Sequence, residues 1–143
     1  GAVVAGAEAR VQQALFDYGD ALGIAFQIVD DLLDYGGSAQ VIGKNVGDDF
    51  RERKLTLPVI KAIAAADADE RAFWERTIGK GKQEDGDLET ALEILHRREA
   101  LSAARADAIA WAGRAKTALD ACPDQPLRLI LSDLADYVVS RLS

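Results

Sequence analysis

The stretch that decides the fold is GIAFQIVDDLLD, at residues 23–34. Residues 21–33 are apolar on nearly every face, which predicts a helix that is buried on most sides. Three acids nevertheless occupy its last turn. An acid near a helix C-terminus opposes the helix dipole at a cost of roughly 0.3–1 kcal/mol. Asp30 and Asp34, four residues apart, repel each other by about 0.2–0.5 kcal/mol. The pattern therefore predicts a positive charge close to this helix end.

A hard divalent cation fits these carboxylates best. Mg²⁺ takes oxygen ligands, retains several waters, and is usually held by one or two carboxylates together with substrate phosphates. Lys44 and Lys54 follow in loop-like stretches, where flexible ammonium groups can reach phosphate oxygens as point charges. The residues predict a magnesium-bridged diphosphate, with Asp30, Asp31 and Asp34 as the candidate metal ligands.

The composition excludes several classes of protein. The chain has 143 residues, is 49% hydrophobic and carries a net charge of −7, which predicts about one domain with a real core. This charge argues against a nucleic-acid surface, since no basic stripe appears apart from the short cluster at residues 51–54. One cysteine, Cys122, cannot form an internal disulfide, which favours a reducing, cytoplasmic compartment. No uncharged stretch approaches the roughly 18 residues of a membrane-spanning helix.

The first residues indicate that the chain is a fragment. Residues 1–7 are small and apolar, as in the middle of a tightly packed helix, and the sequence contains no Met. A helix from about Glu8 to Tyr35 would be roughly 40 Å long, whereas a compact domain of this size has a radius of gyration of only about 14–15 Å. We therefore expect residues 21–33 to need neighbours from a partner chain or from a missing N-terminal half.

The rest of the chain is predicted to be helical. Proline, aspartate and alanine-rich signals mark successive helix starts. The expected helices begin at Pro58, after Asp67 or Asp69, after Asp87, at about Ala100 in a stretch ending near Leu119, and at about Pro126. The last shows apolar residues at i, i+3, i+4 and i+7. No strand-like alternation competes with these helices, so the fold class is all-α.

The aspartates and lysines resemble the second aspartate-rich region of the trans-isoprenyl diphosphate synthases, the polyprenyl synthetase family. The matching residues are Phe26, Gln27, Asp30, Asp31 and Asp34, then Gly43-Lys44, Gly47-Asp48 and Lys54-x-Thr56-Leu57-Pro58. Their order and spacing are specific, since a bare Asp-Asp-x-x-Asp often occurs by chance. The resemblance covers residues 1–143 as the C-terminal portion of a polyprenyl synthetase domain. It is nearest to the long-chain branch, of octaprenyl, decaprenyl and solanesyl type.

This resemblance implies a helical isoprenoid synthase fold around a central cavity. In that family two aspartate-rich motifs face each other across three Mg²⁺ ions, which hold an allylic diphosphate. The diphosphate leaves, and the double bond of isopentenyl diphosphate attacks the resulting cation. The metals and cationic side chains stabilise the leaving group electrostatically. A homodimer is the usual assembly.

The resemblance also assigns roles to individual residues. Asp30 is expected to be the main ligand of the third Mg²⁺, with Asp31 and Asp34 supporting it largely through waters. The two lysines, Lys44 and Lys54, are expected to neutralise the allylic diphosphate. Phe26 and Gln27, one turn earlier, are expected to line the cavity near the reacting carbons.

Two departures from the family pattern matter. The first aspartate-rich motif and the upstream basic residues that bind isopentenyl diphosphate have no counterpart, so this chain alone is expected to be inactive. The family also has Gly directly before the second lysine, where this chain has Arg53. A bulky cation there either adds affinity for phosphate or redirects the loop.

Simpler interpretations remain open for several residues. The aspartates can be a solvated helix end, both lysines can be surface residues, and Phe26 can be core packing. His96 is expected to be a surface residue. At the level of function, terpene cyclisation is disfavoured because cyclases of this fold usually carry an Asn/Ser/Glu metal motif. A noncatalytic helical subunit of a heteromeric prenyl synthase is the remaining alternative.

Overall fold

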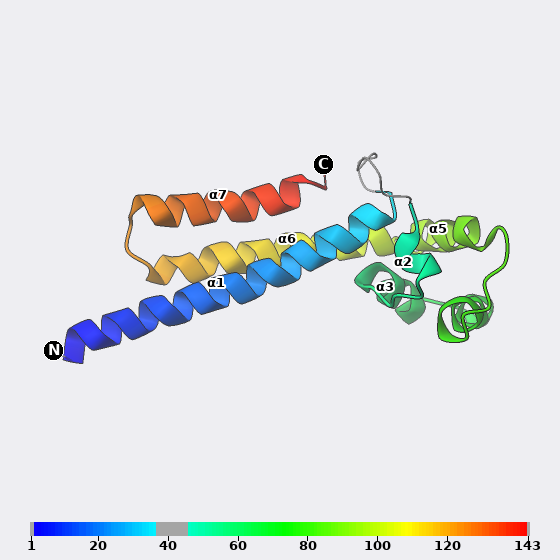
Figure 1. The fold of residues 1–143 in the computed structure, drawn as a ribbon, viewed down its shortest axis with the longest axis horizontal. Coiled ribbons are helices and arrows are strands. Elements are labelled where there is room, and N and C mark those ends of the chain that lie inside the picture. Colours follow the sequence, from blue (N-terminus) through cyan, green and yellow to red (C-terminus); the bar gives the residue numbers. More distant parts are fainter. Residues whose placement is uncertain (1, 37–45, 143) are drawn as a thin grey trace. The chain divides into compact units, whose positions relative to one another are not determined.

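The computed structural model of the chain describes residues 2–36 and 46–142. Its elements are all helical, and no strand occurs in these two ranges, as the sequence predicted (Figure 1). In chain order they are α1 (Ala2–Asp34), α2 (Asp48–Arg51), α3 (Leu57–Ala64), α4 (Ala68–Trp74), the π-helix η1 (Glu75–Gly79), α5 (Asp87–Arg97), α6 (Ala100–Ala118), the 3₁₀ helix η2 (Leu119–Ala121) and α7 (Pro126–Ser140).

The chain divides into two compact units. The first unit comprises Gly1–Val29 and Asp107–Arg141, with Ser143, and the second comprises Asp30–Ala106, with Leu142. Helices α1 and α6 therefore contribute residues to both units. Within the described ranges, none of the helices combines the length and apolar character that a bilayer span requires.

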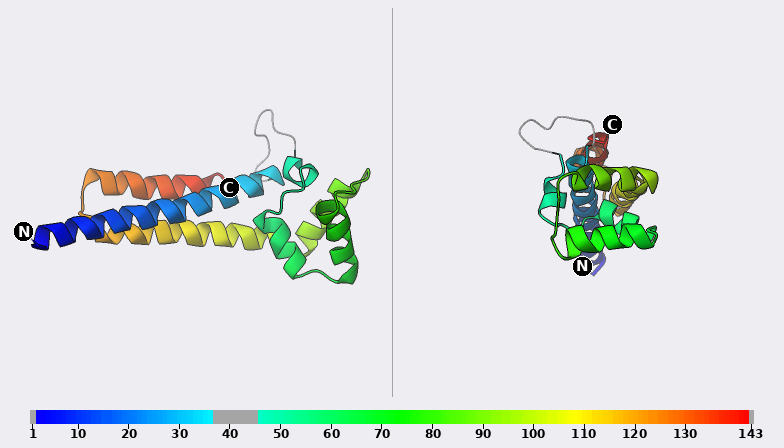
Figure 2. Two further views of the ribbon diagram at one scale, coloured as in Figure 1. Left: turned by 60° about the horizontal axis from the view of Figure 1, so that its bottom comes forward. Right: turned by 90° about the vertical axis from the view of Figure 1, so that its right-hand side faces the viewer.

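Three helices build the first unit. In it α1, α6 and α7 run side by side (Figures 1 and 2). Small side chains allow the helices to approach one another closely, and the buried cluster consists of Tyr18, Ala21, Ala115, Leu119 and Ala135. The Tyr18 hydroxyl donates to the carbonyl of Leu131 at 2.7 Å, which joins α1 to α7. An ion pair of 2.9 Å between Lys116 and Asp136 joins α6 to α7.

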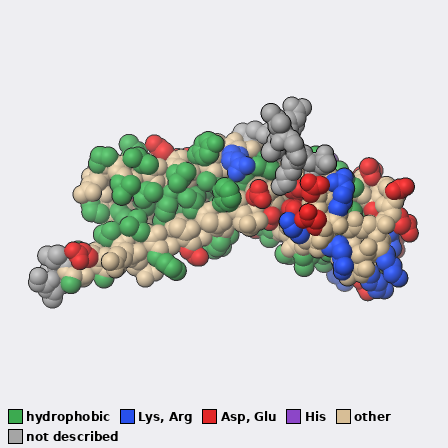
Figure 3. Space-filling view, viewed as in Figure 1, with side chains coloured by type: hydrophobic (Ala, Val, Ile, Leu, Met, Phe, Trp, Pro, Cys, Tyr) green, Lys and Arg blue, Asp and Glu red, His purple; other side chains and the backbone are tan. Residues whose placement is uncertain are grey.

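Helix α7 also exposes large apolar side chains. We call this set the α7 apolar face, and each of its members is between 44% and 65% exposed. Its residues are Leu127, Leu129, Ile130, Leu134 and Tyr137. Hydrophobic side chains gather over this helix in the space-filling view (Figure 3). A monomeric protein rarely exposes a large contiguous apolar patch, so such a face indicates an interaction surface.

Aromatic packing organises the second unit. Phe50 of α2 stacks on Phe73 of α4 with ring centroids 6.4 Å apart, and Trp74 meets both rings edge-on. Aliphatic residues of α3 and α5 complete this core, among them Val59 and Leu95, both fully buried.

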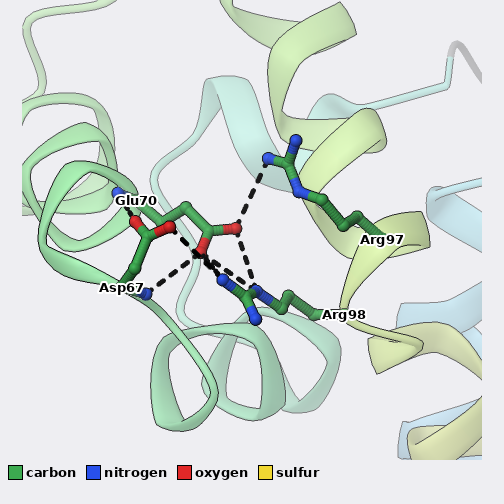
Figure 4. A network of polar contacts seen from close by, with 4 residues as sticks. All are labelled: Asp67, Glu70, Arg97 and Arg98. Atoms are coloured by element: carbon green, nitrogen blue, oxygen red, sulfur yellow. Dashed lines mark hydrogen bonds and ion pairs between the residues drawn. The ribbon is translucent and has the colours of Figure 1, made fainter.

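A polar network joins α4 to the end of α5 (Figure 4). Asp67 and Glu70 form a capping box, with bonds of 2.9 and 3.0 Å between each side chain and the other residue's backbone N–H. Arg98 donates several hydrogen bonds to the buried Glu70 carboxylate, and Arg97 adds a contact of 3.4 Å. The Arg98 hydrogen bonds, together with the Asp67 backbone bond, lower the pKa of Glu70 to about 2.

The predicted helix ends differ in detail from those observed. Asp67 is the N-cap of α4, whereas Asp69 lies within its first turn. Asp87 is the first residue of α5 rather than its cap. Its carboxylate accepts hydrogen bonds from two guanidinium nitrogens of Arg76, at 2.8 and 3.0 Å. It also accepts one from the backbone N–H of Glu84. Gly86, with φ +89, holds the N-cap position of α5 instead.

Candidate functional site

The three predicted metal ligands lie at the C-terminal end of α1, in the second unit. They differ sharply in exposure. Asp34 is 1% exposed and Asp31 is 8% exposed, whereas Asp30 is intermediate. Of the three, Asp30 is therefore the one whose carboxylate is most accessible to a ligand from solution.

Asp34 fastens the end of α1 to the start of α2. Its Oδ2 accepts the backbone N–H of Asp49 at 3.0 Å, and its own carbonyl accepts the N–H of Gly47 at 2.9 Å. The positive partner expected near this helix end is thus supplied in part by a backbone N–H group at the beginning of another helix.

Gly47 is required by this connection. It has φ +86, a conformation that is costly for residues with a side chain. A Cβ at this position would lie 2.5 Å from Cδ1 of Leu88. Both the backbone conformation and the close approach of α5 therefore demand glycine between the aspartate-rich helix and α2.

Lys54 is joined to the aspartates through Asp49. Its ammonium group lies 3.5 Å from Oδ1 of the buried Asp49 and 3.1 Å from the Glu52 carboxylate. The hydrogen bond to Glu52 and the charge of Asp49 raise the pKa of Lys54. Its side chain is nevertheless 57% exposed, so a cation is available at the surface next to the buried Asp34–Asp49 pair.

Arg53, which replaces the usual glycine of the family, adopts the left-handed conformation that this glycine would have. Helix α2 ends in a Schellman motif, in which Lys54 N–H bonds to the carbonyl of Asp49 at 2.9 Å and Arg53 N–H bonds to that of Phe50 at 3.0 Å. The residue after the C-cap of such a motif is left-handed and is usually Gly. Arg53 occupies that place with φ 61, which costs a non-glycine residue roughly 1–2 kcal/mol.

The side chain of Arg53 offsets this strain. Its guanidinium donates to the carbonyls of Ile78 and Gly79, at 2.9 and 2.6 Å, at the end of η1. A cation at a helix C-terminus is favourable. Gly81 makes room for it, since a Cβ there would lie 2.9 Å from the side chain of Arg53. The sequence left open whether Arg53 binds phosphate or redirects the loop. In the structure it holds the loop against η1.

The pKa of the Tyr35 hydroxyl reflects its burial and the negative charge of the site. Tyr35 is 3% exposed. Burial, and then the neighbouring carboxylates of Asp34 and Asp49, raise the pKa of its hydroxyl well above the ordinary value. The buried side of the aspartate-rich end thus favours neutral or cationic partners.

The remaining predicted site residues lie elsewhere. Lys44 falls outside the described residues. Phe26 and Gln27 belong to the first unit and are exposed, Phe26 by 50%. The Arg141 guanidinium lies 5.7 Å from the Phe26 ring centroid, within the range of a cation–π contact. Phe26 is therefore not a core residue in this unit.

The donor set suits Mg²⁺ that arrives with a phosphate ligand. In residues 2–36 and 46–142, no three His, Cys, Asp or Glu side chains are gathered as the ligands of a single metal ion. The end of α1 instead offers carboxylate oxygens, with Asp30 partly open to solvent. Mg²⁺ is usually bound by one or two carboxylates together with substrate phosphates and waters. The residues present therefore fit this ion.

Helical architecture and an aspartate-rich helix end joined to a lysine-bearing turn define the class of protein, and comparisons with known proteins agree. The polyprenyl synthetase family model matches residues 1–95. Octaprenyl diphosphate synthase of Haemophilus influenzae is 37% identical over 98% of this chain, and the chain covers 42% of that relative. This chain belongs to the polyprenyl synthetase family.

Solved structures show the same fold. A decaprenyl diphosphate synthase from Rhodobacter capsulatus is 62% identical, with a TM-score of 0.89 over 99% of this chain and 43% of its own. A polyprenyl synthase from Caulobacter crescentus, complexed with calcium and isoprenyl diphosphate, is 47% identical, with a TM-score of 0.84 over 100% of this chain and 44% of its own. The all-α isoprenoid synthase fold is thus confirmed. The chain spans less than half the length of these relatives.

Sequence reasoning missed one residue of the site and left the role of another open. Asp49 is the buried bridge between Asp34 and Lys54, and only its place after Gly47-Asp48 gave a signal. Arg53 anchors the turn that carries Lys54. Its left-handed conformation could have been inferred from the glycine that the family has at this position.

Proposed function

We propose that the protein carrying this chain is a polyprenyl diphosphate synthase. It condenses isopentenyl diphosphate with an allylic diphosphate in a Mg²⁺-dependent chain elongation. The observation that carries the proposal is the connection between the aspartate-rich end of α1 and the Lys54 turn, made by the Asp34–Asp49 hydrogen bond and the Asp49–Lys54 ion pair. The proposed metal ligands and the proposed phosphate-binding lysine, Lys54, belong to the same unit, which supports a shared role.

Each carboxylate has a distinct role in this proposal. Asp30, the most exposed of the three, is the main metal ligand, and Asp31 supports it through water. Asp34 supports it chiefly by position, because one of its oxygens accepts the Asp49 N–H. Bound Mg²⁺ would supply Lewis-acid stabilisation of the negative charge on the departing diphosphate.

The lysines neutralise the allylic diphosphate. Lys54 already lies among carboxylates on an exposed stem, so its ammonium group can exchange Glu52 for a phosphate oxygen at little desolvation cost. Lys44, which lies outside the described residues, is proposed to neutralise the same diphosphate. Phe26 and Gln27, earlier on α1, line the space for the reacting carbons, where an aromatic face stabilises nearby positive charge.

The wider context is also part of the proposal. Residues 1–143 form the C-terminal portion of a polyprenyl synthetase domain, and this portion alone is inactive because it lacks the first aspartate-rich motif. The synthase is a cytoplasmic homodimer of the long-chain branch. The named octaprenyl and decaprenyl diphosphate synthases support that branch, although a geranylgeranyl pyrophosphate synthase of Geoglobus acetivorans is 39% identical.

A second candidate function is a noncatalytic helical subunit that binds a catalytic partner. The α7 apolar face favours it, since that face suits association with another helical protein. In this case the aspartates would serve only to connect α1 with α2.

The experiment that tests the proposal is incorporation of labelled isopentenyl diphosphate by the full-length protein. Farnesyl diphosphate serves as the allylic primer, with Mg²⁺ present or removed by chelation. Elongation that requires both Mg²⁺ and primer is the expected result. A full-length protein that is inert alone and becomes active only with a second helical protein would instead support the noncatalytic subunit.

A further inference from the structure

Arg53 makes contacts that a glycine at the same position cannot make. The left-handed residue of a Schellman motif has only to complete the turn, and glycine does so without strain. Arg53 completes the same turn with φ 61. It also reaches 25 and 26 residues along the chain to the carbonyls of Ile78 and Gly79. The turn is therefore tied to a second element as well as to its own helix.

Further hydrogen bonds tie the end of α2 to η1 and to the segment after η1. The Gln83 amide donates to the carbonyl of Phe50 at 2.8 Å and to that of Thr77 at 3.1 Å. Arg76 donates to the carbonyl of Lys82 at 2.8 Å, which holds the segment after η1 in place. We call the bonds of Arg53 and Gln83 the α2–η1 clamp. Together they tie the C-terminal turn of α2 to η1 and to the segment that follows η1.

Lys54 follows Arg53 directly and depends on this turn. Its N–H closes the Schellman motif on Asp49, and its ammonium group lies near the carboxylate of the same residue. A long, flexible lysine side chain loses rotamer entropy when it binds a phosphate. Fixing the backbone from which it projects reduces the further entropy that binding would cost.

We infer that Arg53 is a positioning residue, which holds the Lys54 turn against the end of η1 and thereby raises affinity for the diphosphate. The inference rests on the proposed role of Lys54. Arg53 itself does not contact the substrate in this account, because its guanidinium is engaged by the carbonyls of Ile78 and Gly79.

Arg53→Gly in the full-length protein is the most direct test. Glycine is the preferred residue for this turn, so the variant keeps the Schellman motif and removes only the anchor. We expect the Kd for farnesyl diphosphate with Mg²⁺, measured by calorimetry, to rise about fivefold or more. The kcat should stay within about twofold of the wild-type value, because an interaction that stabilises the bound substrate and the transition state equally affects binding alone. Arg53→Lys keeps one donor group, so its Kd is expected to lie between that of the wild type and that of Arg53→Gly.

Two further variants isolate the mechanism. Lys80→Ala removes a cation at the same end of η1 without touching the clamp, since Lys80 pairs only weakly with Glu75, at 3.9 Å. Its Kd is expected to stay near that of the wild type. In a double-mutant cycle, Arg53→Gly should add almost nothing in a Lys54→Ala background, because Arg53 acts through Lys54.

The outcomes separate this inference from the proposed function. An unchanged Kd for Arg53→Gly overturns the positioning role, and so does an equal effect of Arg53→Gly with and without Lys54. If Lys54→Ala itself binds farnesyl diphosphate normally, the Lys54 assignment fails and the inference fails with it, even where the full-length protein still elongates the primer.

Discussion

The carboxylate of Asp34 accepts the backbone N–H of Asp49 at 3.0 Å, so the aspartate-rich end of α1 is fastened to the first turn of α2. Both residues are buried. A buried carboxylate is costly unless it is hydrogen-bonded. The third aspartate of the motif thus has a structural partner within the protein, whereas Asp30, one turn earlier, is left more accessible.

This difference predicts opposite effects of two alanine substitutions on stability. Asp34→Ala leaves the Asp49 N–H buried without its acceptor and should lower the free energy of unfolding by about 1–2 kcal/mol, after the relief of the helix-dipole penalty. Asp30→Ala removes only a repulsive charge and should be neutral or slightly stabilising. Urea denaturation of the full-length protein measures both. Asp34→Asn keeps an acceptor oxygen and should recover most of the loss. Equal stability of the two alanine variants would contradict this account.

Gly47→Ala should be strongly destabilising. The alanine would be held at φ +86 with its Cβ 2.5 Å from Leu88, so strain and overpacking together should cost about 2–4 kcal/mol. Gly86→Ala is the matched control, because φ is +89 there and no atom lies within 4 Å of the added Cβ. It should cost only the backbone strain, about 1–2 kcal/mol. Thermal unfolding compares the two, and a smaller loss for Gly47→Ala than for Gly86→Ala would show that Leu88 does not confine this turn.

The Glu70 network predicts an acid-sensitive contribution to stability. Its folded-state pKa, about 2, lies below the ordinary value of 4.5. The stabilisation is therefore complete above about pH 4.5 and is lost as the pH falls toward 2. At pH 7, Glu70→Gln should lower the free energy of unfolding by about 1.5–3 kcal/mol. The difference from the wild type should shrink steadily below pH 4.5.

The exposed Glu75 provides the control for this network. Glu75 forms a long ion pair with Lys80, at 3.9 Å, and its side chain is 70% exposed. Glu75→Gln should therefore change stability by less than about 0.5 kcal/mol at any pH. Denaturation curves recorded from pH 2 to pH 7 make the comparison. A difference between Glu70→Gln and the wild type that stays constant with pH would rule out the ionised carboxylate as its source.

Lys44→Ala should weaken binding of the allylic diphosphate by about tenfold, the loss of one charge-assisted hydrogen bond. Calorimetric titration of the full-length protein with farnesyl diphosphate and Mg²⁺ measures it. Lys61→Ala, a substitution on α3, is the control. If Lys44→Ala binds farnesyl diphosphate with unchanged affinity, Lys44 is an ordinary surface lysine with no part in diphosphate binding.

Much of the fold could be read from the sequence because its helix signals are local. Pro58, Asp67 and Pro126 mark helix starts that the structure places within a residue of expectation, because capping and the fixed φ of proline act over a few residues. The π-helix at Glu75–Gly79 was not predicted. Carbonyls of this element accept hydrogen bonds from the side chains of Arg53 and Gln83, which lie outside it, and no local helix signal encodes such contacts.

The candidate site was only partly predictable for the same reason. Asp30, Asp31 and Asp34 could be picked out because acids at the end of an apolar helix are anomalous within a single turn. The function of Asp49 as a bridge depends on a bond spanning 15 residues, which no local pattern encodes. The roles of Phe26 and Gln27 stay predictions, because both side chains are exposed in this chain and helical periodicity identifies a face without identifying its neighbours.

Turnover of Asp30→Ala in the full-length protein, assayed as Mg²⁺-dependent incorporation of labelled isopentenyl diphosphate, tests the central claim most directly. Asp20→Ala, another exposed aspartate on α1, is the control. The account predicts a loss of turnover by several orders of magnitude for Asp30→Ala, with normal folding and near-normal activity of the control. Activity of Asp30→Ala within about tenfold of the wild type, a change of only about 1.4 kcal/mol in the barrier, would contradict the assignment of Asp30 as the main metal ligand.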